Sequence, residues 1–146
     1  MTSSPSHGSP VVPATPGAVV ALDTRQFAAT IPGHRFAIID FWAPWCAPCR
    51  SFAPVFEAVA QRHPDVLFAK VDTEAEPAIA RNFGIRSIPM LMVFREDVIV
   101  FAQAGALAGA ALEQVVNTAR ALDMDEVRRE IERESATNAS GAAPAA

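Results

Sequence analysis

The chain has 146 residues, of which 51% are hydrophobic and 19% are charged, so we expect one globular domain with a proper core. Its formal net charge of −4 argues against a nucleic-acid binder, which normally presents a basic face. No stretch approaches the ~20 apolar residues of a membrane span, and the N-terminus has neither the basic start nor the apolar run of a secretory signal. We therefore expect a cytoplasmic protein that binds no membrane, in a compartment where structural disulfides are rare.

The chain begins with a segment, residues 1–17, in which prolines stand among Ser, Thr and Gly. This segment has too little apolar surface to order itself, so we predict a flexible N-terminal arm. A strand is then predicted over 19–22. It is followed by a helix over 24–31, which Thr24 is expected to cap and Pro32-Gly33 to end.

The run FAIIDFW, residues 36–42, is nearly all apolar, which is typical of a strand buried on both faces. A helix is predicted from Cys46 to the His63-Pro64 pair, because its apolar residues recur at helical spacing. A second buried strand is predicted at 66–71, and a short helix at 77–83.

After Pro89 the pattern changes to two strands, 90–94 and 98–104, with three charged residues between them, as in an antiparallel hairpin. A last domain helix is predicted around 112–119. The resulting order is βαβαβαββα, a parallel half followed by a hairpin half. We therefore predict an α/β domain over 18–122, with a central mixed β-sheet flanked by helices on both faces.

A further, amphipathic helix is predicted over residues 123–135, in which Met124, Val127 and Ile131 form a thin apolar stripe. Such a stripe is marginal for a helix that stands alone. The segment is therefore interpreted as a solvated extension of the last domain helix, and a docking surface for a partner or a second copy is the alternative. Residues 136–146 are expected to be a disordered tail.

The motif WCAPC at 45–49 holds both cysteines of the chain, Cys46 and Cys49. Two cysteines are too few for a zinc site, and none of the three histidines stands at zinc-ligand spacing. An iron–sulfur cluster shared between two chains is a weaker alternative. We therefore expect no metal.

The position of the motif favours a redox pair, because it follows a buried strand and opens a helix. A helix N-terminus presents unpaired N–H groups and a partial positive charge, which lower the pKa of a thiol there. The second cysteine is about one helical turn away, close enough for a disulfide. Pro48 suits the first turn, where its missing N–H is not needed.

The stretch DFWAPWCAPCRSFAP resembles the active-site signature of the thioredoxin family. FAKVD at 68–72, FGIRSIP at 83–89 and AGAL at 104–107 fall at that family's intervals, so the resemblance covers about residues 18–122. It implies a thioredoxin fold and a protein-disulfide reductase, with Cys46 as the attacking and Cys49 as the resolving thiol.

The resemblance also assigns roles to Asp40 and Lys70. Asp40 stands among apolar residues in its strand, so its pKa should rise through desolvation. In thioredoxins the matching Asp lies beneath the second cysteine and exchanges a proton with it through water. Lys70, the only lysine in the chain, matches that carboxylate's partner.

A docking patch for the substrate is implied by Pro89, whose peptide bond is cis in this family and faces the disulfide. The backbone near Ile88 would then pair with an extended substrate segment. Trp45 and the Gly105-Ala106 turn would complete the patch.

The resemblance implies no bound cofactor. Reducing equivalents would come from NADPH through thioredoxin reductase, and the partners would be that enzyme and disulfide-containing client proteins. Ala47 and Pro48 add no positive charge between the cysteines, so we expect a potential nearer ~−270 mV than the ~−120 mV of strong oxidants. Ala47 departs from the family's usual glycine and is expected to tune the potential. A monomer in cell redox homeostasis and electron transport is predicted; the alternative is a redox-linked chaperone or interaction module that uses the C-terminal helix.

Overall fold

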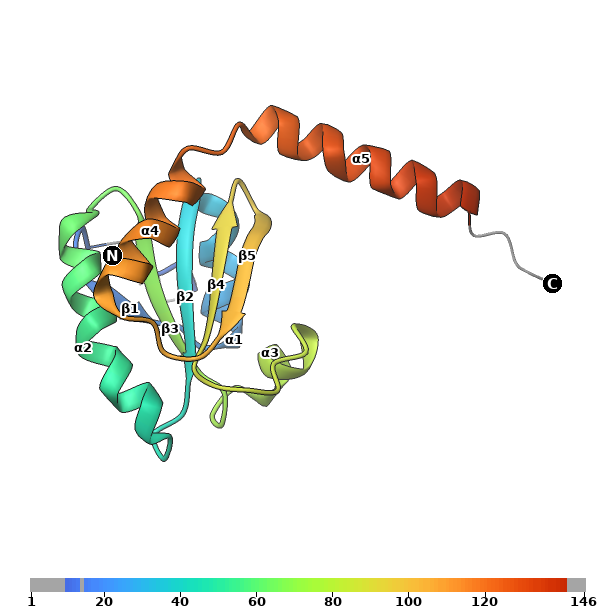
Figure 1. The fold of residues 1–146 in the computed structure, drawn as a ribbon. Coiled ribbons are helices and arrows are strands. Elements are labelled where there is room, and N and C mark those ends of the chain that lie inside the picture. Colours follow the sequence, from blue (N-terminus) through green and yellow to red (C-terminus); the bar gives the residue numbers. More distant parts are fainter. Residues whose placement is uncertain (1–9, 14, 142–146) are drawn as a thin grey trace, which may run out of the picture.

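The computed structural model describes residues 10–13 and 15–141. Most of the predicted N-terminal arm, residues 1–9 and 14, lies outside this range, and so do residues 142–146 of the predicted tail. The described chain forms a five-stranded sheet with helices on both faces, in the order that the sequence predicts (Figure 1).

The first half contains β1 (Val19–Ala21), α1 (Thr24–Thr30), β2 (Phe36–Trp42), α2 (Ala47–Arg62) and β3 (Leu67–Asp72). The second half contains α3 (Pro77–Asn82), β4 (Met90–Arg95), β5 (Val98–Ala104), α4 (Gly109–Arg120) and α5 (Met124–Gly141). A 3₁₀ turn over Ile31–Gly33 ends α1, as the Pro-Gly pair predicts.

The sheet has the strand order β1-β3-β2-β4-β5. Strand β2 is central: it runs parallel to β3 and antiparallel to β4, and β5 forms one edge. The β4–β5 hairpin turns through Glu96 and Asp97, both with positive φ, the backbone geometry of a tight hairpin turn. The predicted mixed sheet is therefore confirmed, with its edge at the hairpin.

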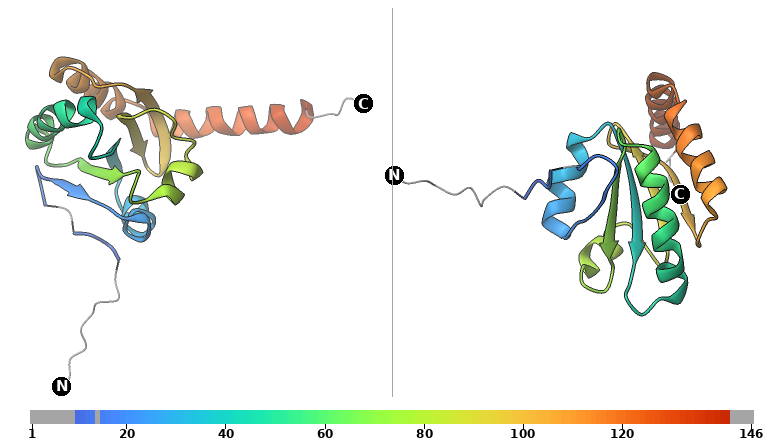
Figure 2. Two further views of the ribbon diagram at one scale, coloured as in Figure 1. Left: turned by 90° about the horizontal axis from the view of Figure 1, so that it is seen from below. Right: turned by 90° about the vertical axis from the view of Figure 1, so that its left-hand side faces the viewer.

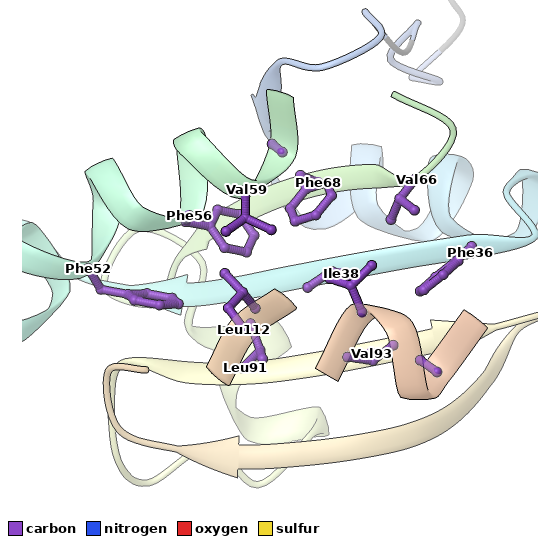
Figure 3. Close-up of a cluster of buried hydrophobic side chains, with 13 residues drawn as sticks. Phe36, Ile38, Phe52, Phe56, Val59, Val66, Phe68, Leu91, Val93 and Leu112 are labelled. Atoms are coloured by element: carbon purple, nitrogen blue, oxygen red, sulfur yellow. The ribbon is translucent and has the colours of Figure 1, made fainter. Parts of the chain in front are cut away.

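The core forms two layers, one on each face of the sheet. Helices α2 and α4 cover one face, and α1 and α3 cover the other (Figures 1 and 2). Figure 3 shows the first layer, in which side chains of β2, β3 and β4 meet those of α2 and α4: Phe36, Ile38, Phe52, Phe56, Val59, Val66, Phe68, Leu91, Val93 and Leu112. Because side chains alternate along a strand, this layer also fixes which face carries the remaining residues of β2 and β3.

The cap of α1 differs from the prediction. Asp23, not Thr24, is the capping residue: its side chain accepts a hydrogen bond from the Gln26 N–H, and Gln26 Oε1 accepts one from the Asp23 N–H. Thr24 instead donates its backbone N–H and its hydroxyl to Glu76 Oε1, at 2.9 and 2.8 Å. The reciprocal bonds of Asp23 and Gln26 satisfy more helix-end donors than a lone Thr hydroxyl could.

Helix α5 begins as predicted but continues to Gly141, beyond the predicted boundary at residue 135. Met124 is buried against the domain, whereas Ile131 is 43% exposed, and Figures 1 and 2 show the helix extending away from the sheet. Ion pairs at a spacing of three residues, such as Arg129 with Glu126 and Arg133 with Glu130, support the exposed part. No helix in the described part of the chain is long and apolar enough to cross a membrane.

Candidate active site

Cys46 and Cys49 form a disulfide at the N-terminus of α2, with their Cα atoms 5.2 Å apart. Cys46 is the capping residue of this helix, and its Sγ accepts a hydrogen bond from the Cys49 N–H at 3.2 Å. The sulfur atom that would carry the thiolate thus occupies the place where a helix stabilises negative charge. Both residues are buried: Cys46 is 4% exposed and Cys49 is 1% exposed.

The loop before the helix is held by hydrogen bonds to its backbone. The Cys46 N–H donates to the Ala43 carbonyl oxygen at 3.1 Å, and Arg50 Nη1 donates to the Pro44 carbonyl oxygen at 2.8 Å. Arg50 follows Cys49 directly, so its side chain reaches back over the motif. The loop is therefore fixed from both of its ends.

The Ile88–Pro89 peptide bond is cis, and it lies next to the disulfide. The carbonyl oxygen of Ile88 is 3.8 Å from Cys46 Sγ, and Ile88 packs against both cysteines. The Gly105 N–H donates to the Pro89 carbonyl oxygen at 2.8 Å, which joins the second loop of the predicted docking patch to the first.

The remaining patch residues lie at the surface. Trp45 is 65% exposed, the highest value among the large hydrophobic side chains. Ala106 is exposed next to Gly105, and Ala47 and Pro48 are exposed in the first turn of α2. An exposed tryptophan beside a buried disulfide is a feature of a binding surface, because it offers a large contact area to a partner.

Asp40 is a buried carboxyl group on the α2 side of the sheet. It is 3% exposed, and its Oδ1 has no hydrogen-bond partner among the residues that the structure describes. Ile38, two residues earlier, packs under α2, so alternation directs Asp40 to the same side, where the first turn of α2 holds Cys49. Desolvation raises the pKa of Asp40 from 3.8 to about 7, against an opposing effect of the positive charge of Lys70.

Lys70 is the register partner of Asp40 across the β2–β3 pair. Its ammonium group lies over the ring of Trp42, with Nζ 5.0 Å from the ring centroid. Trp42 in turn packs against the cluster formed by Ala43 and the two cysteines. Trp42 is not among the site residues predicted from the sequence, although the alternation in FAIIDFW places it on the same face as Asp40 and would have identified it.

The site contains no cluster that suits a metal: the described residues include no group of three His, Cys, Asp or Glu side chains that could hold an ion.

The family model described as Thioredoxin matches residues 18–118. This chain belongs to the thioredoxin family. Among similar thioredoxins is the provisionally named thioredoxin 2 of Streptomyces coelicolor, 53% identical over 117 residues, which cover 80% of this chain and 87% of that protein. The thioredoxin of Mycobacterium bovis is 38% identical over 97 residues, 65% of this chain and 84% of its own.

Solved thioredoxin structures are similar to the fold as well. A mutant thioredoxin of Halobacterium salinarum superposes with a TM-score of 0.69 at 26% identity, over 77% of this chain and 99% of its own. The short form of spinach chloroplast thioredoxin f gives 0.67 at 27% identity, over 75% and 100%. The family and fold implied by the sequence resemblance are therefore confirmed.

Family membership and the Cys46–Cys49 pair together establish a thiol-disulfide oxidoreductase with protein-disulfide reductase activity. The family implies disulfide-containing substrates and thioredoxin reductase as partners. Members of this family need no bound cofactor.

Proposed function

We propose that this thioredoxin reduces client disulfides with Cys46 as the nucleophile, Cys49 as the resolving thiol and Asp40 as the proton acceptor and donor. The observation that carries the proposal is the position of the pair: a disulfide at a helix N-terminus, beside a cis-proline loop and above a buried carboxyl group.

Cys46 is the better nucleophile of the two. Its sulfur accepts the N–H of the first helical turn, a bond that favours the thiolate over the thiol. It also lies next to the Ile88 carbonyl, at the edge of the docking patch, and it is the slightly more exposed of the two buried cysteines, at 4% against 1% for Cys49. A client disulfide therefore reaches Cys46 first.

The reaction balances in two exchanges. The Cys46 thiolate attacks one client sulfur, a Cys46–client disulfide forms, and the released client thiolate takes up a proton. Cys49 then gives its proton to the Asp40 carboxylate and attacks Cys46 Sγ. The second client thiolate leaves and is protonated, so the client gains two electrons and two protons while the Cys46–Cys49 disulfide forms.

Asp40 suits the proton transfer because its pKa of about 7 makes both of its forms available near neutral pH. Its unpartnered Oδ1 is a free acceptor in a buried site. Lys70 supports the ionised form, because its positive charge opposes the effect of burial.

The client binds across Trp45, Ile88, Pro89, Gly105 and Ala106. The Ile88–Pro89 and Gly105 loops are joined by a backbone hydrogen bond, so they form one surface beside Cys46. An extended client segment pairs with the backbone at Ile88, and the Trp45 ring covers its apolar side chains. Ala47 and Pro48 between the cysteines set the potential near that of a reductant.

The electrons come from NADPH through thioredoxin reductase, in the cytoplasm, as part of cellular electron transport. In this proposal the protein acts as a monomer.

Insulin reduction tests the assignment, with dithiothreitol or thioredoxin reductase and NADPH as the electron source. Cys46→Ser is expected to abolish the activity, and Cys49→Ser to accumulate Cys46–client disulfides that a reductant releases. Ala58→Ser, on the exposed face of α2, adds a hydroxyl to the same helix and is the matched control. Insulin reduction that survives in Cys46→Ser would refute the role of Cys46.

A further inference from the structure

Trp42 lies between the two parts of the site. On one side it packs against the buried cluster of Ala43, Cys46 and Cys49. On the other, the Lys70 ammonium lies 5.0 Å from its ring centroid, within the range at which the negative face of an indole attracts a cation. Alternation along β2 and the β2–β3 register place Asp40, Trp42 and Lys70 on one face of the sheet.

Negatively charged groups other than Asp40 also lie near Lys70. A hollow beside Trp42 is lined by Lys70 together with three carboxylates from separate segments: Asp23 before α1, Asp72 at the end of β3 and Glu76 before α3. Gln26 of α1 and Ala21 of β1 also line this hollow. A long, flexible side chain in such a hollow would ordinarily pair with one of the carboxylates.

Each of these carboxylates is already bonded to the backbone. Asp23 accepts the Gln26 N–H at 2.8 Å, and Glu76 accepts the Thr24 N–H at 2.9 Å. Asp72 Oδ1 accepts the N–H groups of Glu74 and Ala75, at 2.9 and 3.2 Å.

Lys70 makes no ion pair with any described residue, and its ammonium group lies over the indole ring of Trp42. The ring is thus the group that decides where the ammonium lies.

We propose that Trp42 is a positioning residue for the proton transfer, because its ring holds the Lys70 ammonium where its charge acts on Asp40 and not on Asp23, Asp72 or Glu76. This inference deepens the proposed role of Asp40 and rests on it. Trp42 touches the disulfide only by packing, and it acts on the carboxyl group through the lysine.

The sign of one measurement separates this role from plain packing. Replacing Trp42 by the smaller Leu admits water, which by itself lowers the pKa of a buried carboxyl group. Release of Lys70 has the opposite effect, because a stabilising positive charge is lost. The two accounts therefore predict opposite shifts of the Asp40 pKa.

The experiment follows the carboxyl group of Asp40 by infrared difference spectroscopy or ¹³C NMR across a pH titration, in the oxidised full-length protein so that no thiol titrates. Trp42→Leu is expected to raise the Asp40 midpoint by about one pH unit, the low end of the effect of a nearby opposite charge. Lys70→Met is expected to raise it as much, and Trp42→Leu in the Lys70→Met background to raise it no further. Trp42→Phe, which keeps a ring, should give a smaller rise.

A second measurement avoids any repacking. In a Trp45→Phe background Trp42 is the only tryptophan, so growth on fluorinated tryptophan weakens the negative face of this ring alone without removing it. The Asp40 midpoint is expected to rise with the number of fluorine atoms.

A fall or no change in Trp42→Leu, an equal rise in the Lys70→Met background, or a midpoint insensitive to fluorination would overturn the proposal. These outcomes concern the Trp42–Lys70 pair alone. Failure of the proposed function would instead be seen as unchanged insulin reduction in Asp40→Asn.

Discussion

Substitution of Asp40 by Asn should stabilise the oxidised protein, and the gain should depend on pH. The carboxyl group is 3% exposed, and its Oδ1 has no hydrogen-bond partner in the described part of the chain, so ionising it in the folded state is costly. Asn has nearly the same shape and cannot ionise. The variant therefore isolates the cost of the charge from that of packing.

The magnitude follows from the raised pKa. A change from 3.8 to about 7, at about 1.4 kcal/mol per pKa unit, corresponds to about 4 kcal/mol. Between these two values the folded protein holds a proton that the unfolded chain has released, so the free energy of unfolding falls as pH rises through about 4 to 7. Above the folded value the loss is complete, and below the unfolded value it is absent.

Urea unfolding at a series of pH values measures this directly. The difference between Asp40→Asn and wild type should be smallest near pH 4, grow with pH, and level off at about 4 kcal/mol above pH 7. Asp97→Asn is the matched control, since Asp97 is an exposed acid in the β4–β5 turn, and it should follow the wild type. A pH-independent difference between Asp40→Asn and wild type would refute the reasoning.

Three further predictions concern the patch, the core and α5. Gly105→Val should strain the backbone of the patch, since φ at this residue is +105°, and should raise KM for insulin several-fold while small disulfides are still reduced. Gly33→Val is the control, because no atom lies within 4 Å of an added Cβ at Gly33 and its φ is outside the positive region. Equal effects of the two substitutions would argue against the patch. Phe52→Ala, on the buried face of α2, should lower the free energy of unfolding by about 3–5 kcal/mol, as measured by urea unfolding. A loss below ~1 kcal/mol would contradict the burial of this side chain. Deletion of residues 123–146 should leave kcat for insulin unchanged, because α5 extends away from the disulfide; a loss of activity without loss of folding would assign α5 a part in the reaction.

The sequence predicts the local structure around the site well where one segment carries the signal. The strand FAIIDFW is β2 from its first residue to its last, because a buried central strand is apolar throughout. The WCAPC motif lies at the start of α2 because Pro48 suits the first helical turn, where its missing N–H is not needed. The cis bond at Pro89 was implied by resemblance and not by physical pattern, and the structure contains it.

What the sequence does not predict depends on partners from other segments. The contact of Lys70 with Trp42 follows from the register of β2 on β3, which no local pattern gives. Asp23 and Thr24 are both good capping residues, and Glu76 decides between them, since it binds Thr24 from 52 positions along the chain. The length of α5 was underestimated, because its small and polar C-terminal residues carry no apolar period.

The layout of the sheet has a consequence for the newly made chain. Both cysteines belong to one helical turn, but Lys70 comes beside Asp40 and Ile88 beside Cys46 only after β3 and β4 have paired with β2. Local helix formation is faster than the pairing of distant strands. A partly folded chain therefore presents a reactive thiol without its proton acceptor's partner or its docking surface. If another chain captures this thiol as a mixed disulfide, Cys49 lies within the same turn and can displace that chain, which leaves as a thiol while the Cys46–Cys49 bond forms.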